Sequence, residues 1–395
     1  MFEYLFILGR TPKLSAEEIK SILESKKINH IVCFSSPEIF HIRTNYKLDT
    51  KDLIMTLGGV IKIALVCETL HIISEAVSKI TEVLSSKKIN KIVFGLSMFG
   101  VIKEISDYDD KTMCAKIKNN LEEKGYDVRY ILGQQNPILS SVVVSKQKVA
   151  EFILLQEENN IILAETLAVQ DFEMWNKRDF QRPWSNTKKG MIPLKVARIM
   201  INLSGISGDN GFSKTLFDPF CGMGTILQEG LSMKFMVLGM DNDSKSVEMA
   251  KKNIDWYCNS FNITNKSQIL KGDATHADET LKNKVDLIVT EPYLGPAFDG
   301  GPKNVKEEYV LRILRGLEKL YIGCLRNWAK ILKPNGVIVI TFPSFVLNNR
   351  EYFVKKVIDN CEKLGYSITI GPIGYFRPQA IVRRNIYKLI KNTEN

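Results

Sequence analysis

The stretch of sequence that decides the fold is DPFCGMGT, residues 218–225. It directly follows an apolar run at 215–217 and precedes an expected helix, so it predicts a strand-to-helix turn. Gly222 and Gly224 would let the backbone approach a ligand closely, and Asp218 could accept a hydrogen bond from a ligand ammonium group. The stretch therefore predicts a cofactor site at the end of a strand. A glycine-rich turn without a ligand is the alternative.

The spacing of the glycines disfavours a nicotinamide-dependent dehydrogenase. That fingerprint needs a third glycine three positions after the second. Here Ile226 and Leu227 fill the stretch, and Gly230 comes too late.

The residues around this turn alternate between expected strands and helices. A helix is expected to open at Pro193 and to end near Leu203. Strands are expected at 215–217, 235–240, 268–271, 285–290, 337–341, 366–371 and 380–389. Such alternation predicts an α/β fold with a parallel, doubly wound sheet. The last two strands are joined by a short turn near residues 374–378, which predicts an antiparallel hairpin at the edge.

Acidic residues follow the second and third of these strands. Asp241 comes 17 residues after Gly224, at a place where a carboxylate can bind both hydroxyls of a ribose. Asp273 follows the third strand and could accept a hydrogen bond from an adenine amino group. A lone Gly-Asp pair is also common in ordinary turns.

The fourth strand runs into Glu291, Pro292 and Tyr293. A carboxylate and a proline-fixed carbonyl can hold the hydrogens of an exocyclic amine and orient its lone pair, while an aromatic ring stacks on the base. The three residues therefore predict chemistry on the amino group of a base. A strand end bounded by proline is the structural alternative.

The N-terminal half shows a different order of elements. Residues 1–70 predict strand, helix, strand, strand, helix and strand, and 71–166 predict a second small α+β unit. Within the second unit, a strand is expected at 139–144 and a hairpin over 151–165. Residues 171–184 are polar with interleaved aromatics, which predicts a linker.

Composition narrows the class of protein. A chain of 395 residues suggests two or three domains. No apolar run is long enough for a membrane span, and the N-terminus lacks a signal-peptide pattern, so a cytoplasmic protein is expected. The seven cysteines are scattered, without a Cys-x-x-Cys pair, and there are four dispersed histidines. We therefore expect no metal site and no disulfide framework.

The net charge of +10 is unevenly distributed. Residues 201–300 carry 9 basic and 13 acidic residues, whereas residues 301–395 carry 17 and 7. A basic face beside an acidic pocket suits a polyanion that presents one group to a buried site, although a solvated lysine-rich surface is equally compatible. The segment 376–388 has four basic and no acidic residues. It could contact phosphate near the site or guard an exposed edge strand.

Together these residues resemble the class I, S-adenosylmethionine-dependent tRNA guanosine N2-methyltransferases that contain a THUMP domain and act at position 10. The resemblance rests on residues 218–224, on Arg178-Asp179 and Arg182-Pro183 with the segment 188–198, and on Leu139-Ser140-Ser141. It implies a Rossmann-like, seven-stranded methyltransferase domain at 191–395. It also implies a ferredoxin-like unit at 1–70, a THUMP RNA-binding domain at 71–166 and a linker at 167–190.

The resemblance also implies a cofactor, a partner and a site. S-adenosylmethionine would bind through Asp218, Gly222, Gly224, Asp241 and Asp273, and tRNA or another structured RNA would present its base to Glu291, Pro292 and Tyr293. The chain departs from the family there, because the usual motif is Asp-Pro-Pro-Tyr or Asn-Pro-Pro-Tyr. Two alternatives therefore stay open: an adenine-N6-type RNA or DNA methyltransferase, and an RNA-binding protein that has lost catalysis.

Overall fold

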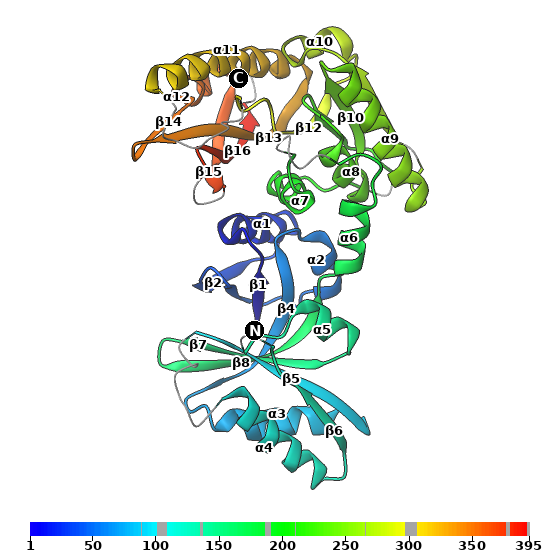
Figure 1. Cartoon of the computed structure of the whole chain (residues 1–395), viewed down its shortest axis with the longest axis vertical. Helices are drawn as coiled ribbons and strands as arrows, with labels where there is room; N and C mark the ends of the chain where they lie inside the picture. Colours follow the sequence, from blue (N-terminus) through cyan, green and yellow to red (C-terminus); the bar gives the residue numbers. More distant parts are fainter. Residues whose placement is uncertain are drawn as a thin grey trace. The chain divides into compact units, whose positions relative to one another are not determined.

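The computed structural model describes residues 1–87, 89–100, 109–134, 137–185, 191–209, 211–264, 266–296, 306–376 and 380–392. The chain divides into two compact units (Figure 1). The first contains residues 1–12 and 27–174, and the second contains residues 13–26 and 175–395.

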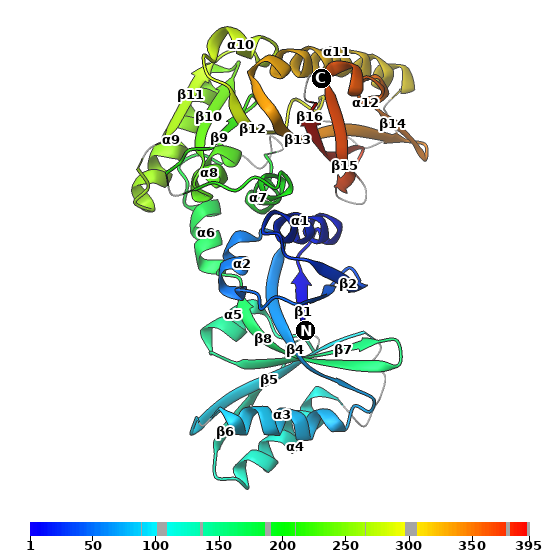
Figure 2. The same cartoon turned by 180° about the vertical axis from the view of Figure 1, so that it is seen from behind.

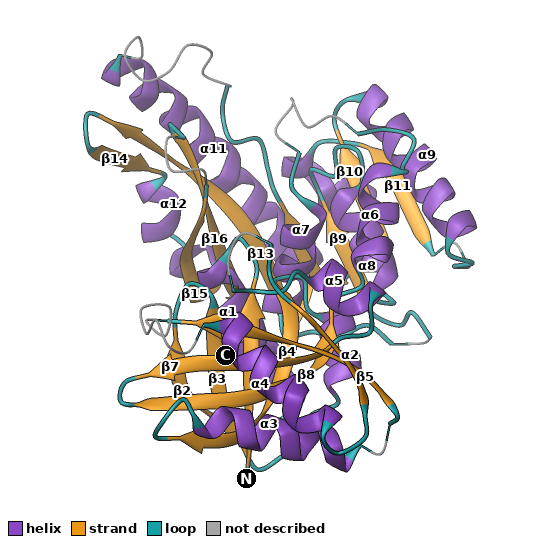
Figure 3. Ribbon diagram, turned by 60° about the horizontal axis from the view of Figure 1, so that its bottom comes forward, coloured by secondary structure: helices purple, strands orange, loops and turns teal. Residues whose placement is uncertain are grey.

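The described residues of the first unit form one eight-stranded sheet in the order β2-β3-β1-β4-β8-β7-β5-β6. Strand β5 runs parallel to β6 and β7, and the other pairs are antiparallel. Helices α3 and α4 bury an apolar face against β5, β7 and β8 (Figure 3). The elements are β1 (Phe2–Leu8), β2 (His30–Ser35), β3 (Ile39–Thr44), α2 (Thr50–Thr56), β4 (Val60–Leu70), α3 (Glu75–Ser86), β5 (Lys91–Phe99), α4 (Asp110–Glu122), β6 (Asp127–Ile131), α5 (Ser141–Lys146), β7 (Ala150–Glu157) and β8 (Asn160–Val169).

The expected order of elements in residues 1–70 is confirmed, as is the hairpin now seen as β7 and β8. The boundary expected at residue 70 stays a prediction, and the strands on its two sides share one sheet. The strand expected at 139–144 is wrong, because helix α5 occupies 141–146. Ser140 caps this helix by accepting a hydrogen bond from the Val143 N–H, which outweighs the strand preference of the valine run.

The second unit contains the alternating elements. They are α1 (Pro12–Ser25), most of α6 (Phe172–Phe180), α7 (Leu194–Leu203), β9 (Thr215–Asp218), α8 (Thr225–Ser232), β10 (Met236–Asp241), α9 (Ser244–Ser260), β11 (Ser267–Lys271), the 3₁₀ turn η4 (Ala274–His276), α10 (Ala277–Thr280), β12 (Val285–Thr290), α11 (Glu307–Ile331), β13 (Leu332–Leu347), β14 (Arg350–Phe353), α12 (Lys355–Asp359), η6 (Glu362–Leu364), β15 (Tyr366–Tyr375) and β16 (Val382–Lys391).

The sheet of this unit has the order β11-β10-β9-β12-β13-β16-β15, with β14 added to β13. Strands β9 to β13 pair in parallel, whereas β16 runs antiparallel to both β13 and β15. The predicted α/β sheet with an antiparallel C-terminal hairpin is therefore confirmed. At the C-terminal side of the sheet, the edge strand is β15. Strand β16 lies between β13 and β15, so the interpretation of 376–388 as a guarded edge strand is wrong for the part of it in β16.

Helices cover both faces of the sheet and give the unit two hydrophobic layers (Figure 1 and Figure 2). Helices α7, α8 and α9 pack on one face, and α10, α11 and α12 pack on the other. The strands are apolar on both sides because both faces are buried. The order of the strands reverses between β9 and β12, and ligands of such sheets bind outside the carboxyl ends of the strands at this reversal.

Helix α1 comes from the first 26 residues but belongs to the second unit. The buried Glu18 carboxylate accepts a hydrogen bond from Asn202 Nδ2 at 2.6 Å. Ser21 Oγ donates to the carbonyls of Asn202 and Leu203 at the end of α7. The end of α7 thus gains hydrogen-bond partners from a helix about 180 residues earlier in the chain.

Candidate active site

The turn of residues 218–224 connects β9 to α8. Gly222 and Gly224 have φ angles of 49° and 84°, in the left-handed region that glycine adopts without strain. The Cys221 N–H donates to the Met240 carbonyl on β10 at 2.9 Å, and the Gly224 N–H donates to the Cys221 carbonyl at 2.7 Å. The turn is therefore fixed against the neighbouring strand, as the two glycines of the motif predict.

Asp218 ends β9 and is only 2% exposed. Its Oδ1 accepts hydrogen bonds from Thr290 Oγ1 at 2.7 Å and from the Phe220 N–H at 3.1 Å. Burial is the main reason that the pKa of Asp218 rises to about 7, and the negative charges of Asp241 and Glu291 add to the rise. Among the described residues, Oδ2 has no hydrogen-bond partner. This oxygen is available to a ligand donor.

Asp241 ends β10, beside the same turn. Its Oδ2 accepts the Gly222 N–H at 3.0 Å and its Oδ1 accepts the Asp243 N–H at 2.9 Å. A carboxylate has about four lone-pair positions, so two further bonds remain possible. Asp243 itself caps α9, as its position predicts.

Asp273 follows β11 and is 64% exposed at its side chain. Its Oδ1 accepts bonds from the N–H and the Oγ1 of Thr275, both at 2.8 Å, so it caps the turn η4. These bonds lower the pKa of Asp273. The capping role matches the ordinary-turn interpretation. A role toward adenine stays a prediction that uses Oδ2, which lies 3.6 Å from His276 Nδ1.

Glu291 and Pro292 follow β12 directly, and Tyr293 comes next. The Glu291 carboxylate forms an ion pair with Arg384 Nε on β16, and its side chain is 11% exposed. Burial raises the pKa of Glu291, and Arg384 opposes the rise. Tyr293 is 56% exposed as a residue, while its carbonyl accepts a hydrogen bond from the buried Tyr321 hydroxyl at 2.6 Å.

The strand pairing explains why these groups meet. Strand β9 lies between β10 and β12, with Gly239 opposite Asp218 and Ile288 opposite Phe217. The carboxyl ends of the three parallel strands therefore share one edge. The hydrogen bond from Thr290 to Asp218 joins the first and fourth strands of the motif there. Gly300 and Gly301, in the loop after Tyr293, lie outside the described residues.

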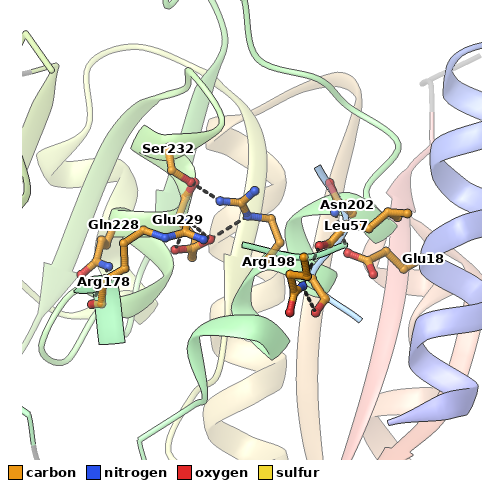
Figure 4. A network of polar contacts seen from close by, with 10 residues as sticks. Glu18, Leu57, Arg178, Arg198, Asn202, Gln228, Glu229 and Ser232 are labelled. Atoms are coloured by element: carbon orange, nitrogen blue, oxygen red, sulfur yellow. Dashed lines mark hydrogen bonds and ion pairs between the residues drawn. The ribbon is translucent and has the colours of Figure 1, made fainter. Parts of the chain in front are cut away.

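The segment expected as a linker contains helix α6, which the sequence reasoning missed. Arg178 Nη1 contacts both carboxylate oxygens of Glu229 on α8, at 3.0 and 3.1 Å, and Arg198 Nε on α7 donates to Glu229 Oε2 at 2.6 Å (Figure 4). Arg182 Nη1 donates to Thr225 Oγ1 at the start of α8. These contacts fix the segment to the helix that follows the glycine turn. Residues 186–190 of the segment lie outside the described residues.

A side-chain amide joins this segment to the turn itself. Asn253 on α9 accepts a hydrogen bond from the Trp184 N–H and donates to the carbonyls of Trp184 and Met223, all at 2.9 Å. Arg182 and Pro183, which contribute to the family resemblance, directly precede Trp184. A polar side chain on a distant helix, rather than a local pattern, positions Trp184.

One group of possible metal ligands occurs among the described residues, far along the chain from this site. Glu3, Cys33 and His41 lie on β1, β2 and β3. Both ring nitrogens of His41 already face carboxylates, Nε2 at 3.0 Å from Glu3 and Nδ1 at 2.9 Å from Glu157. Both ring nitrogens of His41 thus already have carboxylate partners, and the absence of a metal stays a prediction. None of the described helices is both long and apolar enough to cross a membrane.

Comparison with known proteins gives the site a context. The sequence matches a tRNA (guanine(10)-N2)-dimethyltransferase of Methanothermobacter thermautotrophicus with 34% identity over 191 residues, which is 48% of this chain and 49% of the relative. The enzyme of the same name from Pyrococcus abyssi is 30% identical over 171 residues, 43% of this chain and 42% of the relative. The chain thus spans about half the length of these curated relatives, or less.

Solved structures match over nearly the whole chain. TrmN from Thermus thermophilus has a TM-score of 0.54 at 14% identity and covers 98% of this chain and 99% of its own. SMU.472, described as a putative methyltransferase complexed with SAH, has a TM-score of 0.50 at 11% identity and covers 100% and 99%. These identities support the fold alone. The family model described as "RMKL-like, methyltransferase domain" matches residues 182–347. Residues 182–347 are therefore similar to this methyltransferase domain family, and the two solved structures show that the fold is Rossmann-like.

Proposed function

We propose that the chain is an S-adenosylmethionine-dependent methyltransferase that modifies the exocyclic N2 amine of a guanosine in tRNA. The observation that carries the proposal is the meeting of Asp218, Asp241 and Glu291 at one edge of a class I sheet. The match of residues 182–347 to a methyltransferase domain supports the reaction. The two relatives named for guanine-10 N2 dimethylation support the substrate.

The donor set at the sheet edge fits the cofactor. Bound S-adenosylmethionine supplies a methyl group on a positively charged sulfur. Asp218 Oδ2 would accept a hydrogen bond from the cofactor's ammonium group, and Asp241 would accept bonds from the ribose hydroxyls. Left-handed Gly222 faces open space where the cofactor would approach, whereas left-handed Gly224 packs against Ala250 of α9. Asp273 would contact the adenine amino group through Oδ2.

The residues after β12 would receive the base. Glu291 would accept a hydrogen bond from the target amine, which orients the lone pair on nitrogen toward the methyl group. The exposed Tyr293 ring would stack on the base, and the bond from Tyr321 to the Tyr293 carbonyl holds the backbone of this motif in place. Pro292 fixes the backbone between the two contacts.

The first unit is proposed to bind the RNA. We assign residues 71–166 as a THUMP-type domain and residues 1–70 as a ferredoxin-like unit, on the order of their elements and on the resemblance at Leu139-Ser140-Ser141. A base stacked in folded RNA must be extruded to reach the cofactor, at a cost of a few kcal/mol. Phosphate contacts outside the catalytic domain would offset this cost and make affinity strongly dependent on salt.

The direct test is nucleoside mass spectrometry of an unmodified tRNA transcript after incubation with the full chain and S-adenosylmethionine. N2-methylguanosine or its dimethyl form in the transcript, absent when guanosine 10 is replaced by adenosine, is the expected result. N6-methyladenosine would instead support the adenine alternative. A chain that binds cofactor and tRNA but leaves every nucleoside unmodified would refute the proposal in favour of a binding-only protein.

A further inference from the structure

Arg384 reaches the proposed catalytic carboxylate from a strand that is not adjacent to it. Glu291 follows β12 and Arg384 lies on β16, with β13 between the two strands. Along β13, Ile340 is the partner of Thr290 and Pro343 is the partner of Arg384. The Arg384 side chain therefore extends past the end of β12, where its Nε donates to Glu291 Oε1.

This contact fixes one oxygen of the carboxylate and leaves the other available. Glu291 Oε2 has no hydrogen-bond partner among the residues that the structure describes. The side chains of Glu291 and Arg384 are 11% and 26% exposed, so water screens the pair only weakly. A charge-assisted bond of this kind restricts the rotamer of a side chain that would otherwise have three flexible torsions.

The electrostatic surroundings give the arginine a second effect. Asp218 and the Tyr321 hydroxyl are close enough for the charge of Glu291 to raise their pKa values, and neither brings a positive charge. Burial among such groups favours the protonated form of Glu291. In that form the carboxyl has no charged oxygen to accept a hydrogen bond from the target amine. Arg384 opposes this by favouring the ionised form of Glu291.

The pair also compensates for the unusual motif. A glutamate is one methylene longer than the aspartate or asparagine usual in the family that the sequence resembles, so its carboxylate has more freedom. We propose that Arg384 is a positioning residue for the methyl transfer, holding Glu291 ionised and in one orientation so that Oε2 faces the target amine. This inference rests on the proposed function of the site.

In the methyl-transfer step, one bond forms and one bond breaks. The amine nitrogen uses its lone pair to form the bond to the methyl carbon, and the electron pair of the broken carbon–sulfur bond stays with sulfur. The N–H proton that Glu291 Oε2 had accepted in a hydrogen bond passes through this carboxylate to water. Arg384 takes no part in bond making, and its effect should be visible only through Glu291.

The test compares Arg384→Gln, Arg384→Lys and Arg383→Gln in the full chain, with kcat measured from pH 5.5 to 9. Arg384→Gln should lower kcat at pH 7 by about 10-fold or more and move the acid limb of the profile up by about one pH unit or more, as expected for loss of an adjacent positive charge. Affinity for S-adenosylhomocysteine should stay within about twofold of the parent value. Arg384→Lys keeps the charge and should restore most of the acid limb.

Arg383→Gln is the matched control. Arg383 is the neighbouring arginine on β16, and it lies 4.5 Å from the centroid of the Phe376 ring. Its removal should leave the acid limb where it is in the parent. An Arg384→Gln variant with the parental acid limb would overturn the inference, as would a lysine variant no better than the glutamine variant.

Failure of the proposed function can be recognised separately. If the parent chain methylates no nucleoside, the function fails, and the inference is then tested without turnover. The titration of Glu291 is followed by NMR with ¹³C-labelled glutamate, with Glu291→Gln assigning the signal. An apparent pKa that is the same in the parent and in Arg384→Gln would overturn the positioning role.

Discussion

The buried carboxyl of Asp218 makes cofactor affinity depend on pH. Its pKa is about 7 in the chain without a ligand, whereas the ordinary value is 3.8. An ammonium group binds the ionised form, so binding at lower pH must first remove a proton from Asp218. With a pKa of about 7, the ionised fraction falls from about one half at pH 7 to about one eleventh at pH 6. Affinity should therefore weaken about fivefold from pH 7 to pH 6, and about 15-fold from pH 7 to pH 5.5.

Calorimetry with S-adenosylhomocysteine measures this without turnover. Titrations of the full chain at pH 5.5, 6 and 7, each in two buffers of different ionisation enthalpy, give both the affinity and the number of protons released. Release should approach one proton per site at pH 5.5. Asp218→Asn should bind more weakly than the parent at pH 7 and show little dependence on pH.

Two results would refute this reasoning. A dissociation constant that is the same at pH 5.5 and 7 in the parent would mean that Asp218 does not bind the ammonium group in its ionised form. A variant Asp218→Asn that keeps the parental pH dependence would assign the titration to another carboxylate at the same edge.

Three further predictions concern the same unit. Glu229→Gln should lower the free energy of unfolding in urea by about 3–5 kcal/mol, because it leaves two buried arginines without their carboxylate, while the exposed-pair control Glu248→Gln should change it by less than about 1 kcal/mol. Asp241→Ala should weaken cofactor binding by about 10- to 150-fold in calorimetry, and an unchanged affinity in the folded variant would reject the ribose contact. Glu291→Ala should cut turnover about 100-fold or more with nearly parental cofactor affinity, and parental turnover in this variant would mean that the acceptor lies elsewhere. Tyr293→Ala should lower both turnover and tRNA affinity.

The central strands could be predicted because strands buried on both faces have a recognisable apolar sequence. Both faces of β9, β10 and β12 are covered by helices, so each strand is a short, nearly continuous apolar run bounded by turn residues. The acidic residue at the end of each run then identifies the edge where a ligand can bind. This logic correctly predicted the elements around 215–290, and it depends only on neighbours in the sequence.

The features that the sequence did not predict depend on contacts between residues far apart along the chain. Helix α5 begins where it does because Leu139 is held from both sides, its N–H by Ser97 Oγ and its carbonyl by Lys62 Nζ. Helix α6 buries only Trp175 and Arg178 rather than an apolar stripe, so its pattern resembles that of a polar linker. Arg384 meets Glu291 across 93 residues, and only the position of β16 inside the sheet brings them together.

Helix α1 comes early in the chain but packs in the second unit, which matters for synthesis of the chain and for designing fragments. Residues 13–26 are synthesised before the helix α7 that they bind, which is made about 170 residues later. During that interval the apolar side of α1 needs temporary cover, from a chaperone or from the ribosome surface. A fragment that starts after residue 174 would also lack this helix. A catalytic fragment should therefore be made by supplying residues 1–26 as a separate peptide or by joining them to the fragment with a new linker.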